Sequence, residues 1–158
     1  MANPIRRLET RDHDALVEIY REAVLSSTAA FYTAAQQSAW AKQCEAIPPM
    51  LCHGQDLVGC DPHDRPVAFC LREPEDRIAL LYCHPTRQRQ GFAQALLRAS
   101  EAAAAATGQT ILRTEASLIS QPLFKALGWR ISWREELLIA GVHFHRFRMH
   151  KQLSGDTA

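Results

Sequence analysis

A chain of 158 residues, 47% of them apolar, is long enough to form one domain with a hydrophobic core. Its 18 basic and 17 acidic residues leave a net charge of +1, which gives no surplus for binding a nucleic-acid backbone. Its apolar runs fall far short of the roughly 20 residues that cross a membrane, and its first residues lack the apolar core of a signal peptide. We therefore predict a cytoplasmic protein that binds neither nucleic acid nor membrane.

Apolar spacing and turn residues predict a single α/β domain over residues 1–153, with a disordered tail over 154–158. The elements follow the order β-α-α-β-β-β-α-β-α-β-β around a mixed central sheet. Strands are predicted over 4–9, 56–60, 66–71, 77–83, 110–114, 129–139 and 142–149, and helices over 12–26, 33–46, 92–106 and 120–127. The last two strands form a hairpin that turns at Ala140-Gly141.

Capping residues set the bounds of the first two helices. Thr10 and Asp12 are both suitable N-caps for the first helix, and Thr33 is suitable for the second. Pro48 and Pro49 are predicted to end the second helix, because proline lacks the N–H that a helix interior needs.

The metal-ligating residue types show no convincing cluster. The five cysteines contain no C-x-x-C pair, which argues against zinc, and a cytosolic location favours reduced thiols. His143 and His145 share one face of a strand, but no third ligand is in view, and a solvated strand face is the simpler interpretation. No metal is predicted.

The most informative stretch is a strand, a tight loop and a helix start within residues 77–97. An apolar run ends at His84-Pro85, and Gly91 then opens an amphipathic helix. Unpaired backbone N–H groups at a helix N-terminus suit a phosphate or a pyrophosphate, and small residues let the anion approach. The predicted anion-binding residues are Gln88, Arg89, Gln90, Gly91, Phe92 and Ala93.

The spacing Gln88-x-x-Gly91-x-Ala93 resembles the acyl-CoA signature R/Q-x-x-G-x-G/A of the GNAT superfamily of N-acetyltransferases. Alone this match is weak, because an ordinary β-loop-α connection with a glycine at its turn would also produce it. A second segment strengthens it, since Thr114 to Trp129 resembles the family's strand and short helix that end in a Gly-aromatic pair. The segment from Tyr32-Thr33 to Trp40 also resembles the second helix of a subgroup of small bacterial members.

The resemblance implies a site for acetyl-CoA as co-substrate. In such proteins the end of the central strand, here Leu81, Tyr82 and Cys83, pairs its backbone with the pantetheine arm, although these residues also suit plain sheet core. Ser117 stands where the family often has an asparagine that contacts pantetheine, and it can donate one hydrogen bond. Phe124 stands where many members have a tyrosine that protonates the departing thiolate, so the usual acid is missing.

Two other residues are candidates for the chemistry. Glu115 is predicted to be the base that takes the proton of the attacking amine, with a salt-bridge partner as the alternative. Tyr32 is a candidate acid or substrate-orienting hydroxyl, with a half-buried aromatic as the alternative. Trp40, together with Phe31 and Tyr32, is a candidate lining of the acceptor pocket, although a tryptophan on such a helix is more often core.

The leading interpretation is an N-acetyltransferase that moves an acetyl group from acetyl-CoA to a primary amine of a small molecule. A non-catalytic acyl-CoA binding or sensing domain is the alternative, kept open by Phe124. A phosphate-binding interaction domain unrelated to CoA is a third hypothesis. The sequence identifies neither the acceptor nor the oligomeric state, and a homodimer is left open.

Overall fold

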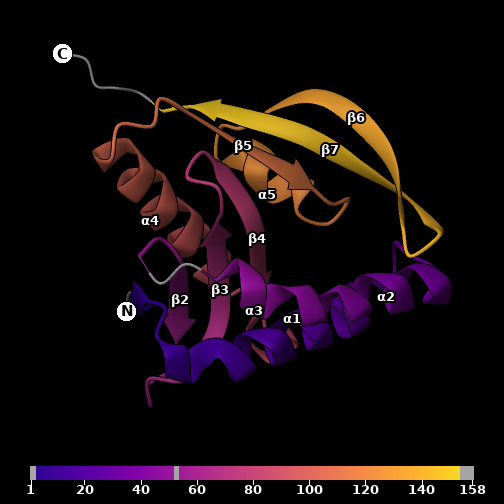
Figure 1. Ribbon diagram of the computed structural model, residues 1–158, viewed down its shortest axis with the longest axis horizontal. Helices are drawn as coiled ribbons and strands as arrows, with labels where there is room; N and C mark the ends of the chain where they lie inside the picture. The colour runs from indigo at the N-terminus through magenta and orange to yellow at the C-terminus, as the bar shows by residue number, and fades with distance from the viewer. Residues whose placement is uncertain (1–2, 52–53, 154–158) are drawn as a thin grey trace.

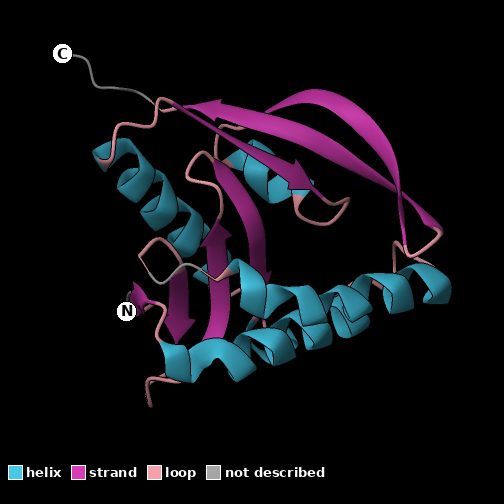
Figure 2. Cartoon of the chain, viewed as in Figure 1, coloured by secondary structure: helices cyan, strands magenta, loops and turns pink. Residues whose placement is uncertain are grey.

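The computed structural model describes residues 3–51 and 54–153, which form a seven-stranded mixed sheet with helices on both faces (Figure 1, Figure 2). The strands are β1 (Ile5–Arg7), β2 (Leu57–Cys60), β3 (Pro66–Arg72), β4 (Arg77–Cys83), β5 (Ile111–Ala116), β6 (Arg130–Ile139) and β7 (Val142–Gln152). The helices are α1 (His13–Ser27), α2 (Ala34–Ala41), α3 (Ile47–Met50), α4 (Phe92–Ala106) and α5 (Gln121–Ala126). The α/β class and the predicted order of elements are confirmed, apart from α3, which the sequence did not predict.

The strands lie in the order β1-β2-β3-β4-β5-β7-β6. Neighbouring strands are antiparallel except β4 and β5, which are parallel and are connected through α4. The closing hairpin turns at Ala140-Gly141 as predicted, and both residues have positive φ, 49° and 79°. This conformation matches the twist of the two strands that the turn joins.

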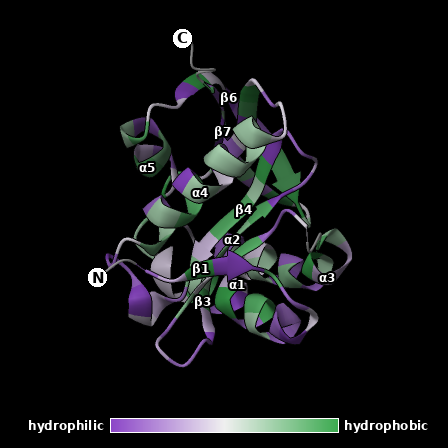
Figure 3. Ribbon diagram, turned by 90° about the vertical axis from the view of Figure 1, so that its left-hand side faces the viewer, coloured by the Kyte–Doolittle hydropathy of each residue, from purple (hydrophilic) through white to green (hydrophobic). Residues whose placement is uncertain are grey.

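The side chains of β3 show how the layers are built. Ala68 and Cys70 point into the core that α4 covers, whereas Phe69 and Leu71 point into the core that α1 covers. Alternate residues of a strand face opposite sides of a sheet, so one apolar strand supplies both cores. Figure 3 shows the apolar run of β4 between the same two layers. Among the described residues, no helix combines the length and the apolarity that a membrane crossing requires.

The predicted end of the second helix was wrong. Thr33 does cap α2, with Gln36 completing a capping box, but α2 gives way at Lys42–Ala46 to a 3-10 helix and then to α3. Pro48 and Pro49 lie inside α3 instead of ending a helix. A proline is tolerated in the first turn of a helix, because the N–H that it lacks would have no partner there.

Other boundaries also differ from the prediction. Thr10–Asp12 forms a 3-10 turn before α1, and the Asp12 carboxylate bonds backwards to the Glu9 N–H and to Arg6 instead of capping the helix. Strand β5 runs two residues beyond the predicted Thr114, so Glu115 lies within it. The tail predicted over 154–158 lies outside the described residues.

Candidate active site

A slot opens in the sheet between β4 and β5. These strands pair only at Arg77 with Arg113 and at Ile78 with Thr114, whose hydroxyl donates to the Ile78 carbonyl at 2.7 Å. Arg72 of β3 opposes Ile78 while Leu71 opposes Leu80, which leaves Ala79 as the extra residue of a β-bulge. A bulge bends its strand, and here the bend coincides with the point where β4 leaves β5.

The free edge of β4 faces this slot. The His84 N–H donates to the Val67 carbonyl of the neighbouring strand at 2.8 Å. Because hydrogen-bonding direction alternates along an antiparallel strand, the backbone of Tyr82 also faces β3, whereas the backbones of Leu81 and Cys83 face the slot. The prediction that all three pair with a ligand therefore needs correction at Tyr82, whose backbone is directed to β3.

The loop that opens α4 presents a row of backbone donors. Within the described ranges, no acceptor is found for the N–H groups of residues 88–94. Arg89 and Gly91 have positive φ, 61° and 86°, which curls the loop around the helix N-terminus. The Asn3 side chain donates to the Gln90 carbonyl at 2.7 Å, and the Gln88 side chain donates to the Ser27 hydroxyl at 2.9 Å. These two bonds hold the loop without using its N–H groups.

Phe92 anchors the same helix end. Its side chain is buried, and its ring carbon lies 2.7 Å from where a Cβ on Gly59 of β2 would be. Only a glycine at position 59 therefore lets this ring lie so close to the strand. Of the predicted anion-binding residues, Phe92 can offer its backbone N–H, while its ring belongs to the core.

A cavity of about 820 Å³ joins the slot to the space under α1, α2 and α3. Its lining includes Tyr32, Trp40 and Phe144, whose rings meet with centroids 5.1 to 6.2 Å apart. The Trp40 indole N–H donates to the Tyr82 hydroxyl at 3.1 Å, which fixes the tryptophan over β4. The prediction that Tyr32 and Trp40 line a pocket agrees with this arrangement. Phe31 does not join them, because its side chain is 63% exposed and lies outside the cavity.

The Tyr32 hydroxyl reaches the far end of β5. Its oxygen accepts the Leu118 N–H at 3.0 Å, and burial raises the pKa of this phenol, so it stays protonated at neutral pH. The neighbouring Ser117 hydroxyl accepts the N–H groups of Ile119 and Ser120, which shapes the turn into α5. Phe124 lines the cavity with a nearly fully buried ring, packed edge-on against Trp129 at 5.0 Å. Ser117 and Phe124 thus both line the cavity, and their contact with the cofactor stays a prediction.

Glu115 lies in a row of alternating charges across the sheet. Its carboxylate contacts Arg77 of β4 at 2.9 Å and Arg148 of β7 at 3.8 Å. Glu135 of β6 continues the row, bound by Arg148 at 2.9 Å and by Arg146 at 2.6 Å. The side chain of Glu115 is only 9% exposed and lines the cavity, so it is both a salt-bridge partner and a neighbour of the slot.

Sequence reasoning missed Arg77, Arg146 and Phe144 as cavity residues. The predicted hairpin contained the signal for Arg146, because a turn at Ala140-Gly141 pairs this residue with Glu135. Among the described residues, no group of three potential metal ligands comes together, and His145 instead lies 3.4 Å from the Glu136 carboxylate.

Comparisons with known proteins agree on one family. A family model described as the Acetyltransferase (GNAT) domain matches residues 13–151. A GCN5-related N-acetyltransferase from Rhodopseudomonas palustris is 27% identical and superposes with a TM-score of 0.89 over 97% of both chains. Among curated proteins, no match to this chain is found.

Two more distant structures share the fold and hold a CoA ligand. PaiA N-acetyltransferase from Thermoplasma acidophilum, in complex with coenzyme A, is 17% identical, with a TM-score of 0.73 over 96% of this chain and 99% of that one. YncA from Salmonella typhimurium, with acetyl-CoA, is 20% identical, with a TM-score of 0.68 over 100% of this chain and 98% of that one.

Proposed function

Because this chain belongs to the GNAT acetyltransferase family, we propose that it transfers an acetyl group from acetyl-CoA to a primary amine of a small molecule. One observation carries the proposal. The free edge of β4 and the donor loop before α4 open onto a single cavity, which also contains a carboxylate and a phenol. A long ligand with an anionic middle and a reactive end suits this arrangement.

The residues present fit acetyl-CoA. The backbone N–H groups of residues 88–94 would hold its pyrophosphate at the N-terminus of α4, where the helix dipole adds to the attraction. The slot-facing backbones of Leu81 and Cys83 would bind the pantetheine amides as an added strand does. Acetyl-CoA supplies a thioester whose acetyl carbon is attacked by the amine and whose sulfur leaves.

The chain must then move two protons. The amine attacks only when neutral, and in this proposal Glu115 takes its proton, directly or through one water. Tyr32 gives a proton to the departing sulfur, since its oxygen is held at the end of β5 and its raised pKa keeps the O–H intact. An N–H at the slot edge of β4 stabilises the charge that develops on the carbonyl oxygen.

The competing account of Glu115 is purely structural, because Arg77 and Arg148 already hold its carboxylate. Glu115→Gln separates the two roles. If Glu115 is the base, the variant should lose kcat by roughly 10²-fold, most severely at low pH, where neutral amine is scarce. If Glu115 only holds the arginines, the variant should lose stability and keep its pH–rate profile.

The whole proposal is tested by thiol release from acetyl-CoA with a panel of primary amines. Turnover that depends on the amine, with an N-acetyl product identified by mass spectrometry, is the expected result. Acetyl-CoA binding by calorimetry with no turnover across the panel would instead support the acyl-CoA binding or sensing domain. A shift in melting temperature with ATP but not with CoA would support neither the acetyltransferase nor the acyl-CoA binding domain.

A further inference from the structure

The charged row beside the cavity is not balanced. It contains three guanidinium groups, on Arg77, Arg146 and Arg148, and two carboxylates, on Glu115 and Glu135. All five side chains lie on the sheet face that α1 and α2 partly cover. One positive charge is therefore left without a partner in the row.

The unmatched charge can be assigned to one side chain. Arg77 directs Nε and one terminal nitrogen to Glu115 and the other terminal nitrogen to the Glu73 carbonyl at 3.2 Å. Arg148 uses Nε and one terminal nitrogen on Glu135, and its other terminal nitrogen faces Glu115. Arg146 donates only from Nε, to Glu135 at 2.6 Å, and within the described chain no partner is found for its two terminal nitrogens.

Arg146 also lies in the right place to meet a ligand. Its side chain is 29% exposed and lines the cavity next to Phe144, on a strand separated from β4 by β5. The loop over residues 88–94, which would hold the pyrophosphate, follows β4, whereas Arg146 lies on β7 beyond β5. This guanidinium is therefore on the side of the slot proposed for the acceptor. Its Nε bond to Glu135 fixes the plane of the fork, and a fixed fork binds a carboxylate with two parallel hydrogen bonds.

From this geometry we infer that the acceptor is an amine that also carries a carboxylate, which Arg146 binds. The inference rests on the proposed function for the amine, but the carboxylate site itself can be tested without turnover. The apolar wall formed by Tyr32, Trp40 and Phe144 favours an acceptor whose body between these two groups is hydrophobic. An apolar amino acid has this combination.

The binding experiment uses pairs of ligands that differ only in charge. 3-Phenylpropionate and 4-methylpentanoate are each compared with their amides by calorimetry, in protein saturated with CoA. We expect each carboxylate to bind at least tenfold more tightly than its amide. In Arg146→Gln this preference should disappear, and Arg146→Lys should keep part of it, because lysine retains the charge but not the fork.

The matched control is Arg113→Gln. Arg113 lies on the same sheet face, but it is paired with Asp76 at 3.3 Å and lies outside the cavity, so the control should leave the preference unchanged. Arg146→Gln should fold, because Glu135 keeps its bond to Arg148. Melting temperatures of all variants check this point. Equal affinity for carboxylates and amides in the wild type, or a preference that survives Arg146→Gln, overturns the inference.

A second experiment separates this inference from the proposed function. Thiol release is measured with L-leucine beside isopentylamine and with L-phenylalanine beside phenethylamine. Arg146→Gln should raise KM for the amino acids by roughly tenfold or more and leave KM for the plain amines unchanged. Turnover of plain amines with no advantage for the amino acids would keep the transferase and reject the carboxylate site. A carboxylate preference in binding with no turnover of any amine would keep the carboxylate site and reject the transferase.

Discussion

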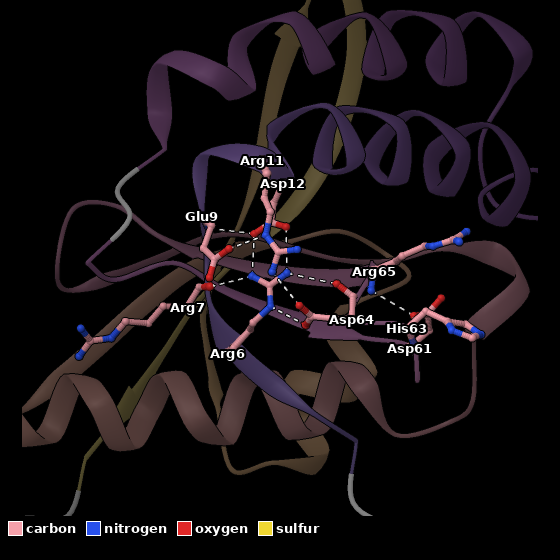
Figure 4. Close-up of polar contacts among 9 residues, drawn as sticks. All are labelled: Arg6, Arg7, Glu9, Arg11, Asp12, Asp61, His63, Asp64 and Arg65. Carbon is pink, nitrogen blue, oxygen red and sulfur yellow. Dashed lines mark hydrogen bonds and ion pairs between the residues drawn. The ribbon is translucent and has the colours of Figure 1, made fainter.

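Two polar regions of the described chain differ in whether their hydrogen-bonding groups are already used. In the first, Arg6 directs two nitrogens to Asp12 at 2.8 and 2.9 Å and its Nε to Asp64 at 2.8 Å (Figure 4). Arg11 adds a bond to Asp64 at 2.6 Å. In the second, the loop over residues 88–94, the backbone donors have no partner in the described chain.

The comparison shows that a high density of charge does not identify a binding site. The Arg6 network joins β1, the turn before α1 and the turn between β2 and β3, and its guanidinium has no nitrogen left for a ligand. The loop before α4 is held by side chains that leave its N–H groups free. Unused donors next to a cavity are the better sign of function, and predictions at both regions test this distinction.

The largest effect is expected where the donors are free. Gly91→Glu adds a carboxylate at the helix N-terminus, and two like charges about 4 Å apart near a protein surface repel by on the order of 4 kcal/mol. CoA affinity should therefore fall roughly 10³-fold, as measured by calorimetry. Gly108→Glu is the matched control, because Gly108 has a similar positive φ of 94° at the other end of the same helix, with open space around it.

Both glycine variants should lose a similar amount of stability, about 1 kcal/mol, since a side chain is strained at positive φ. Only Gly91→Glu should also lose affinity for CoA. Equal CoA affinity in the two folded variants would contradict the assignment of the loop.

The next largest effect is a loss of stability, and it is expected in the Arg6 network, where every guanidinium nitrogen already has a partner. Arg6→Ala leaves the Asp12 carboxylate, only 2% exposed, without its main partner, and should lower the free energy of unfolding by roughly 2 kcal/mol. Denaturant unfolding measures this loss. CoA affinity should stay within about threefold of the wild type, because the network is saturated. A large loss of CoA affinity in this variant would show that the two regions are coupled.

The same network gives a pH dependence of known sign. Hydrogen bonds from Arg6 and Arg11 lower the pKa of Asp64 to about 2. An unfolded aspartate titrates near roughly 3.9, so the stabilisation is fully present above about pH 4 and is lost as the pH falls toward 2. Burial, the largest single influence, raises the pKa of Asp12, but the bonds from Arg6 and from the Glu9 backbone lower it on balance. Unfolding free energy should therefore fall less steeply below pH 4 in Arg6→Ala than in the wild type.

The sequence predicted the free donors better than the used ones. The loop before α4 was predictable because a local motif specifies its backbone geometry, and the position of the hairpin turn determines which residues of β6 and β7 face each other. The contact between Tyr32 and Leu118 joins residues 86 apart, and only tertiary packing creates it. The bulge at Ala79, which opens the slot, also depends on how β3 and β4 pair rather than on the local sequence.

Tyr32 is a case between the two regions, because its oxygen already accepts the Leu118 N–H while its O–H is proposed to serve the sulfur. Tyr32→Phe should lower kcat by roughly tenfold and leave CoA affinity unchanged. This is less than general acids usually contribute, because a thiol has a pKa near roughly 8.5 and its thiolate leaves readily. Single-turnover kinetics at saturating acetyl-CoA measures the effect. An unchanged rate would assign the proton to solvent.

The smallest effect is expected at Phe124, the position at which the family resemblance would place a tyrosine acid. With Tyr32 present, Phe124→Tyr should change kcat by less than about threefold, because one hydroxyl already serves the sulfur. In a Tyr32→Phe background the same substitution should recover most of the lost rate, and the non-additivity measures whether the two positions serve one proton transfer. Additive effects, or a tenfold gain from Phe124→Tyr alone, would show that Tyr32 does not fill the missing role.

Melting curves are the control, because a hydroxyl added to a ring that is 2% exposed costs about 1 to 3 kcal/mol if it finds no partner. A recovered rate together with only a small fall in melting temperature would mean that the new hydroxyl points into the cavity, where it is available to the ligand.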